Sequence, residues 1–181
     1  MAEHTSRLYD SYTIPNSVLK KELRLIRHPE GGYFAETDRQ TEQVPSPFAN
    51  GALRSIATTI YYLLAPDEPN GVFHMNKSAT MHVLHQGRAE YTLITPGSPP
   101  KIEKKIMGPN IHAGELLQLL VPTGVWKMSR LLPEDLSAAS ESGSQDRWED
   151  HGFLTRKAFE DLWDGAVPPE AQGLAQYTKD D

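Results

Sequence analysis

The chain of 181 residues contains no cysteine. This absence excludes disulfide bonds, thiolate nucleophiles and zinc sites built from thiolates. No apolar run approaches the roughly 20 residues that a membrane-spanning helix needs. The first residues, Met-Ala-Glu-His-Thr-Ser-Arg, also hold no apolar stretch of the kind found in secretory signals. We therefore expect a cytoplasmic protein that does not bind membranes.

Basic clusters are missing as well. The formal net charge is −6 at pH 7, and no group of Lys and Arg residues alternates with aromatic residues. Nucleic-acid binding is therefore not expected. The length suits one domain with a substantial core. A hydrophobic content of 38% with 14 prolines fits a loop-rich β protein.

Strand signals dominate the middle of the chain. Segments rich in β-branched and aromatic residues, bounded by Gly and Pro, predict strands at 33–37, 55–64, 81–86, 88–95, 102–107, 116–121 and 125–131. Gly87 lies between two of them and predicts a tight hairpin. One short helix is expected to begin at Asn16 or Ser17, and another to span 155–164. So many short strands with so little helix favour a sandwich or a barrel.

Two segments have the composition of inserts. Residues 43–51 indicate an irregular loop, and the Ser-rich residues 133–150 indicate a flexible loop. The second is either a lid over a barrel or a solvated surface loop. We expect a flexible N-terminal segment over 1–15, one domain over 16–165 and a C-terminal tail over 166–181.

Two stretches have the spacing of the cupin motifs. In metal-binding cupins the first motif has His-x-His, then a Glu and a Gly, and the second ends Pro-x-Gly-x-x-His. Here the first stretch runs from Gly71 to Gly87 and keeps one ligand, His74. The other three ligand positions hold Asn76, Thr80 and Lys127. Neutral Asn and Thr are poor ligands for zinc, iron or nickel, and a lysine cation repels a metal, so we predict no essential metal and no cofactor.

A closer resemblance rests on the run His-Pro-Glu-Gly-Gly-Tyr-Phe-Ala-Glu-Thr at 28–37, on Arg54-Ser55, on Ile-Tyr-Tyr-Leu-Leu at 60–64 and on Phe73-His74. These residues resemble the DUF985 (Cupin_5) family of RmlC-like cupins, over about residues 18–164. The resemblance implies an all-β cupin jelly roll, a double-stranded β-helix barrel with short terminal helices. It also implies a small-molecule site in the barrel and a homodimer. The chain departs from the family at 78–83, where Ser-Ala-Thr-Met-His-Val replaces an acidic pair and a Trp.

Strand alternation predicts which of these side chains face the barrel interior. Counting from the cupin positions, the inner residues are His74, Asn76, Thr80, His82, Lys127 and Ser129. A β-bulge would reverse the residues that follow it.

Three of these residues are the catalytic candidates. His74 is either a general acid or base or a histidine held by hydrogen bonds, and we hypothesise that it is the base. His82 is either a second base or a filler at the family's Trp position. Lys127 is a base, an amine nucleophile or a clamp for an anionic ligand, unless Trp126 takes the inner position instead.

The remaining candidates would bind the substrate: Tyr33, Glu36, Arg54, Tyr61, Asn76, Thr80, Gln118, Trp126 and Ser129. Glu36 either supplies the carboxylate of the pocket or pairs with Arg54. Tyr61 and Gln118 are expected on inner strands, where each either donates a hydrogen bond to a ligand or only lines the core. The sequence thus predicts a metal-independent isomerase, epimerase, dehydratase or cyclase acting on a small organic molecule. The alternatives are a non-catalytic binding protein for a small ligand and a metal-dependent cupin enzyme.

Overall fold

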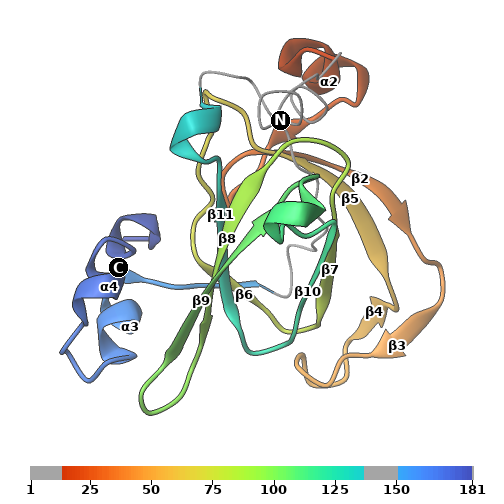
Figure 1. Ribbon diagram of the computed structural model, residues 1–181. Helices are drawn as coiled ribbons and strands as arrows, with labels where there is room; N and C mark the ends of the chain where they lie inside the picture. The colour runs from red at the N-terminus through yellow and green to blue at the C-terminus, as the bar shows by residue number, and fades with distance from the viewer. Residues whose placement is uncertain (1–13, 137–150, 181) are drawn as a thin grey trace.

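The computed structural model describes residues 14–136 and 151–180 (Figure 1). The expected N-terminal segment, up to residue 13, lies outside the described residues. So do residues 137–150, which make up most of the expected Ser-rich loop.

Short strands are the main regular structure of the described residues, with only a few short helices beside them, and this confirms the predicted all-β class. They are β1 (Ile26–Arg27), β2 (Tyr33–Arg39), β3 (Gln43–Pro45), β4 (Leu53–Ser55), β5 (Thr58–Leu63), β6 (His74–Asn76), β7 (Thr80–Val83), β8 (Ala89–Thr95), β9 (Lys101–Met107), β10 (Gln118–Val121), β11 (Trp126–Arg130) and β12 (His151–Phe153). The helices are α2 (Asn16–Glu22), α3 (Arg156–Asp161) and α4 (Pro169–Gln172), with short 3-10 turns at Ile111–Ala113, Pro133–Asp135 and Ala175–Tyr177. No helix among the described residues is long and apolar enough to cross a membrane.

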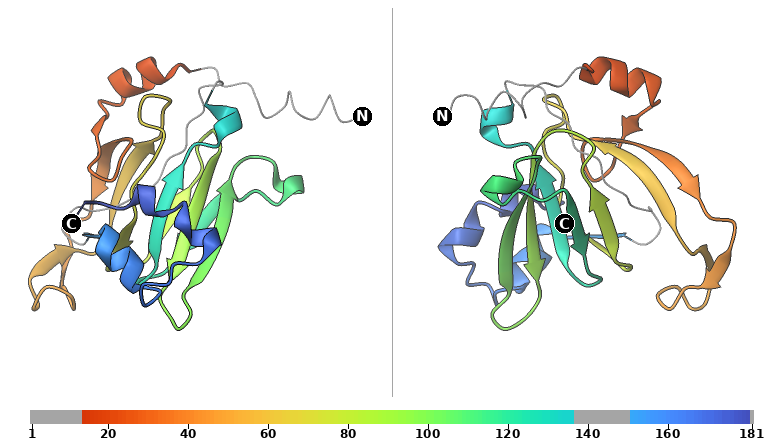
Figure 2. Two further views of the ribbon diagram at one scale, coloured as in Figure 1. Left: turned by 90° about the vertical axis from the view of Figure 1, so that its left-hand side faces the viewer. Right: turned by 45° about the vertical axis from the view of Figure 1, so that its right-hand side comes forward.

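The strands form antiparallel sheets around a shared interior (Figures 1 and 2). A five-stranded sheet has the order β12-β6-β11-β8-β9, a three-stranded sheet the order β1-β2-β5, and β7 pairs with β10. One apolar cluster contains Phe34 from β2, Ile60 from β5, Leu93 from β8 and Leu119 from β10. Because this cluster draws on every one of these sheets, they enclose a single core, as in a barrel.

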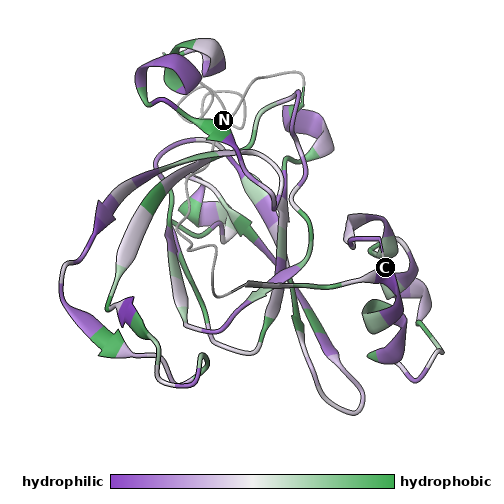
Figure 3. Cartoon of the chain, turned by 180° about the vertical axis from the view of Figure 1, so that it is seen from behind, coloured by the Kyte–Doolittle hydropathy of each residue, from purple (hydrophilic) through white to green (hydrophobic). Residues whose placement is uncertain are grey.

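The five-stranded sheet is covered on its outer side too. Figures 1 and 2 show α3 and α4 beside this sheet, and a second apolar cluster there contains Phe73, Met128, Phe159 and Leu174. The residues after 165, expected to be a tail, belong to this layer. The backbone N–H of Phe73 donates to the carbonyl of Tyr177 at 2.7 Å. The central strands are therefore buried on both faces, although Figure 3 shows hydrophilic and hydrophobic residues alternating along the strands.

Two local predictions are wrong. The strands on either side of Gly87 do not form a hairpin, because β7 pairs with β10 whereas β8 pairs with β9 and β11. Gly87, with a φ of 85°, instead lies where the chain passes from one sheet to another. The segment 43–51 is also not all loop, since β3 pairs with β4. A glycine between two strand patterns marks a turn, but it does not say whether the two strands pair.

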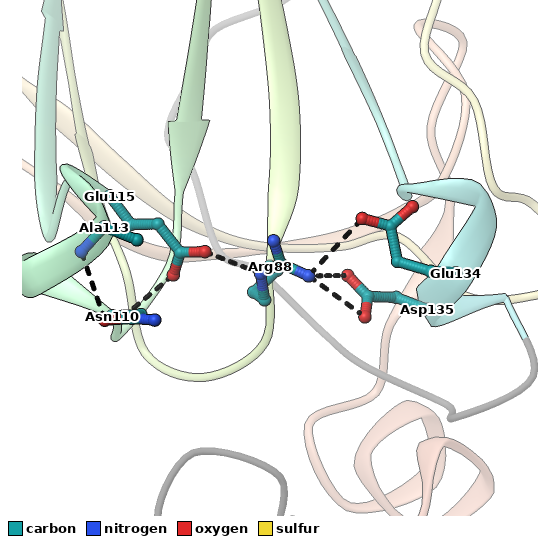
Figure 4. Close-up of polar contacts among 6 residues, drawn as sticks. All are labelled: Arg88, Asn110, Ala113, Glu115, Glu134 and Asp135. Atoms are coloured by element: carbon teal, nitrogen blue, oxygen red, sulfur yellow. Dashed lines mark hydrogen bonds and ion pairs between the residues drawn. The ribbon is translucent and has the colours of Figure 1, made fainter. Parts of the chain in front are cut away.

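Arg88, next to this passage, joins three parts of the chain (Figure 4). Its Nε donates to Glu115 Oε1 at 2.8 Å, and its Nη1 lies 3.1 Å from Asp135 Oδ2 and 3.7 Å from Glu134 Oε1. The backbone N–H of Asn110 donates to Glu115 Oε2 at 2.9 Å. Arg88 therefore fastens the turn Pro133–Asp135, which follows β11, to the loop that leads into β10.

Helix α2 is held to the barrel by one carboxylate. Asp67 accepts hydrogen bonds from Lys20 Nζ at 2.8 Å and from the Tyr33 hydroxyl at 2.6 Å. Lys20 Nζ also lies 3.9 Å from the centre of the Tyr33 ring. The hydrogen bond from Lys20 is the main cause that lowers the pKa of Asp67 below its ordinary value of 3.8.

We expect this attachment to be lost in acid. A carboxyl whose pKa is depressed in the folded state stabilises the fold above its ordinary pKa, and this contribution disappears as the pH falls through the folded value. Asp67→Asn should therefore lower the free energy of unfolding at pH 7, and the difference from the parent should shrink as the pH falls below about 4. Urea titrations of both proteins across this range measure it. An equal difference at pH 7 and pH 2.5 would contradict the assignment.

Candidate functional site

A small cavity lies inside the barrel. Its lining residues are Glu30, Ile60, Tyr62, His74, His82, Tyr91, Lys127 and Ser129. They come from β5, β6, β7, β8, β11 and the turn after β1. The cavity has room for about one water molecule. Apart from Ile60, every lining residue carries a polar group. The cavity therefore brings together several side chains that can bind a ligand by hydrogen bonds or exchange a proton with it.

Lys127 reaches across the interior from β11 to β7. Its Nζ lies 3.2 Å from His82 Nε2, and both residues are 1% exposed. The contact requires one nitrogen to accept, so a single proton lies between the two atoms. His82 is therefore neutral when Lys127 is an ammonium, and Lys127 is a neutral amine when the proton sits on His82. The Tyr91 hydroxyl lies 3.4 Å from the other ring nitrogen of His82.

His74 lies next to a buried carboxylate. Its Nδ1 lies 2.9 Å from the carbonyl oxygen of Val72, which can only accept, so Nδ1 carries hydrogen. Its Nε2 lies 3.2 Å from Glu30 Oε2. This distance allows an ion pair when the imidazole is protonated, but the contact does not have the geometry of a hydrogen bond.

The turn after β1 holds Glu30 in place. Its backbone N–H donates to His28 Nδ1 at 3.1 Å, and its carbonyl accepts from the N–H of Val72 at 2.8 Å. The next residue, Gly31, has a φ of +86°, and a Cβ there would lie 2.2 Å from the carbonyl oxygen of Asn70. The close approach of the two backbones brings Glu30 against the segment that leads to His74. The paired glycines of the sequence run are needed for this approach.

Tyr62 adds a neutral hydroxyl to the cavity. Burial raises the pKa of the Tyr62 phenol well above its ordinary value of 10.0, against the opposing effect of a hydrogen bond with the Ser129 side chain. The phenol therefore keeps its proton at neutral pH and serves as a hydrogen-bond donor.

The predicted inward orientation is confirmed on β6, β7 and β11. His74, His82, Lys127 and Ser129 all line the cavity. Asn76 and Thr80 are buried on the same strands but are not among the residues that line it.

The apolar layer outside the five-stranded sheet explains why Lys127, and not Trp126, faces the cavity. Trp126 packs against the second apolar cluster, with Phe73 and Met128, so Lys127 takes the inner face. The catalytic and binding roles of all these residues remain predictions.

Other predicted residues lie elsewhere. Glu36 forms an ion pair with Arg39, and Arg54 donates to the Ser78 hydroxyl at 2.6 Å, so the expected pairing of Glu36 with Arg54 is wrong. The exposed Glu36 also lies outside the cavity. The Tyr33 hydroxyl is bound to Asp67 in the α2 attachment instead.

Tyr61 and Gln118 were expected on inner faces and are exposed. On β5 the inner residues are Ile60 and Tyr62. The predicted inner residue, Tyr61, therefore lies one position away from the observed ones. A one-residue displacement moves a side chain to the opposite face of the sheet.

Sequence reasoning also missed Glu30, Tyr62 and Tyr91. Glu30 stands in the same run at 28–37 as Glu36, the carboxylate that the sequence predicts for the pocket. The available signal was the pair of glycines after Glu30, because a backbone that tight implies close contact with another segment.

The donor set does not fit the metal of metal-binding cupins. Within residues 14–136 and 151–180, no group of three or more His, Asp or Glu side chains is arranged to hold a metal ion. At the position of the last cupin ligand, Lys127 Nζ lies 3.2 Å from His82 Nε2. A cation bound beside His82 would face this amino group, which favours anions over metals.

Comparison with known proteins agrees with the fold. The family model described as "Cupin superfamily (DUF985)" matches residues 18–145. The uncharacterized protein YML079W of Saccharomyces cerevisiae is 38% identical over 172 residues, which cover 87% of this chain and 83% of that protein.

Two solved structures are similar in fold. One is a hypothetical protein from Leishmania major, with a TM-score of 0.76 and 23% identity, covering 93% of this chain and 100% of that one. The other is protein SO0799 from Shewanella oneidensis, with a TM-score of 0.72 and 20% identity, again covering 93% and 100%. At these identities the structural matches establish the fold alone.

Proposed function

This chain belongs to the DUF985 (Cupin_5) family of the cupin superfamily, and we propose that its barrel binds a small oxygenated organic molecule and moves a proton on it without a metal ion. The reaction class is isomerisation or epimerisation, dehydration or cyclisation. One observation carries the proposal. The buried contact of Lys127 with His82 lies in the same cavity as the pair of His74 and Glu30.

Each pair has a distinct part in this chemistry. The pair of Lys127 and His82 carries one positive charge while either residue is protonated, and it can accept a proton when both are neutral. His74, beside the Glu30 carboxylate, exchanges a proton with an oxygen or carbon of the substrate. The Tyr62 hydroxyl adds a donor for a developing oxyanion. His74 thus remains an acid–base residue, but it acts together with Glu30 and not as a lone base.

Hydrogen exchange tests the proposal without knowledge of the physiological substrate. We expect the protein to catalyse deuterium incorporation from D₂O beside the carbonyl of at least one compound in a panel of small keto acids, hydroxyaldehydes and sugars, followed by proton NMR. Exchange should persist after treatment with a chelator, because the mechanism uses no metal. Saturable binding without exchange would support the binding-protein alternative instead. Exchange that is lost with the chelator and restored by a metal would overturn the proposal.

A homodimer is also proposed, and the outer face of β7 and β10 supports it. Met81 and Leu120 are cross-strand partners in this sheet and are 40% and 56% exposed. Leu117 nearby is 51% exposed. Adjacent exposed apolar side chains favour an interface, and two-fold dimers are the commonest assembly.

Light scattering at micromolar concentration should give a mass of twice 20.2 kDa. Leu120→Lys should shift the protein towards monomer, because a buried unpaired charge is costly. The matched control is Leu53→Lys, at a leucine on β4 that is 65% exposed, and it should leave the mass unchanged. A monomeric parent protein would contradict the proposal.

A further inference from the structure

We propose that Lys127 is an amine nucleophile that forms an imine with a small aldehyde or ketone in the barrel. The inference rests on the proposed function, since it names the substrate class of that site and the bond through which Lys127 acts. An imine draws electrons from the neighbouring carbon and so makes the C–H bond there acidic, which is the bond that a proton-transfer enzyme must break.

The contact with His82 supplies the unprotonated amine that this chemistry needs. Only an unprotonated amine attacks a carbonyl carbon, and lysines become nucleophilic where they are desolvated or lie beside another cationic group. Lys127 meets both conditions, since it is 1% exposed and its Nζ lies 3.2 Å from His82 Nε2. When the shared proton sits on the imidazole, Nζ is left with its lone pair. His82 is then the neighbouring cation, and it becomes a proton acceptor once it has given its proton to the carbonyl oxygen.

The same cavity holds further polar groups for the carbonyl oxygen. The Tyr62 hydroxyl can donate a hydrogen bond to it. His74 is the direct cross-strand partner of Lys127 in the sheet, and its Nε2 lies 3.2 Å from Glu30 Oε2. The space between these groups has room for about one water molecule. That is the size of a carbonyl oxygen, and also of the water that imine formation releases. The cavity thus suits a ligand that enters with its carbonyl group first.

The step balances with these residues alone. The nitrogen lone pair of Lys127 forms a C–N bond, and the carbonyl π electrons move to oxygen, which takes the Nε2 proton of the His82 imidazolium. The nitrogen then passes one proton to the neutral imidazole, which gives it to the same oxygen as the C–O bond breaks and water leaves. The iminium nitrogen gives its remaining proton to His82, which becomes an imidazolium again, so one C=O and two N–H bonds become one C=N bond and one water.

Reductive trapping tests the imine directly. The folded full-length protein is incubated with glycolaldehyde, acetaldehyde or pyruvate and a low concentration of cyanoborohydride, and the labelled lysines are located by peptide mass spectrometry. We expect Lys127 to be labelled before Lys101 and Lys104, whose side chains are 69% and 51% exposed. His82→Asn should slow labelling of Lys127 on the order of 10²-fold, the lower end of the range for general acid–base catalysis. Labelling of the two exposed lysines in that variant should not change.

The outcomes separate this inference from the proposed function. If Lys101 and Lys104 are labelled and Lys127 is not, the imine is excluded, whereas hydrogen exchange by the same protein would leave proton transfer standing. Lys127→Arg keeps the positive charge but cannot form an imine, so it should abolish exchange. Exchange retained in a folded Lys127→Arg protein would overturn the imine. If that variant does not fold, the order of labelling in the parent protein still decides.

Discussion

His74→Gln is expected to lower turnover on the order of 10²–10⁴-fold, the usual scale for loss of a general acid or base, while the barrel stays folded. Glutamine has a similar size and can still donate to the carbonyl of Val72, but it cannot exchange a proton. The measurement is the rate of deuterium exchange, or kcat once a substrate is known. The matched control is His112→Gln, at an exposed histidine in the turn Ile111–Ala113, which should have no effect.

Two further variants sharpen this prediction. Glu30→Gln should have an effect of similar size, and the double variant should be little worse than either single one, because His74 Nε2 and Glu30 Oε2 lie 3.2 Å apart and the two residues act as a unit in the proposed reaction. Lys127→Met should weaken the binding of an anionic ligand and the reaction together. Full turnover in His74→Gln combined with complete loss in Lys127→Met would contradict the role of His74. It would leave an amine-based mechanism that does not use the pair of His74 and Glu30.

Gly31→Ala should be among the most destabilising single substitutions, with a loss of more than about 3 kcal/mol in the free energy of unfolding. The backbone at Gly31 has a φ of +86°, and the added Cβ would lie 2.2 Å from the carbonyl oxygen of Asn70. That oxygen cannot easily retreat, because the neighbouring Gly71 donates to the Ser129 carbonyl at 2.7 Å. The substitution therefore combines backbone strain with a clash between two fixed segments.

Gly51 provides the control for this prediction. Its φ of +79° is nearly the same, but a Cβ there would meet nothing within 4 Å. Gly51→Ala should therefore cost only the strain of the left-handed conformation, about 1–2 kcal/mol. Urea denaturation of both variants measures the difference. An equal loss of unfolding free energy in the two variants would show that a Cβ at residue 31 does not clash with Asn70.

The sequence predicted most accurately which side chains face the barrel interior on strands where a motif identified one inward residue. The alternation of side chains could then be counted from that residue. On β6, β7 and β11 the cupin spacing supplied this residue, and His74, His82 and Lys127 all line the cavity as predicted. On β5 no motif supplied it, and the expected Tyr61 proved to be the exposed neighbour of the inward Tyr62. Alternation alone states that two adjacent residues face opposite sides, but not which of them faces the core.

Contacts between distant segments were the part that the sequence could not supply. Glu30 lies 44 positions before His74 in the chain, and only the folded turn brings Oε2 to 3.2 Å from Nε2. The pairing of β7 with β10 is of the same kind, since it joins Thr80 to Val121. Local propensity carries no information about such pairings, because many registers satisfy the same pattern of apolar residues.

The double burial of β11 has a consequence for how this chain can vary in evolution. Lys127 and Ser129 face the cavity, whereas Trp126 and Met128 face the layer formed by α3, α4 and the residues after them. Deleting one residue just before this strand would exchange the two faces, placing an indole among the polar groups and an amine among the apolar ones. Single replacements at these positions disturb one environment, but a change of length disturbs both at once. Among natural relatives, insertions and deletions should therefore be rarer than substitutions along residues 125–131.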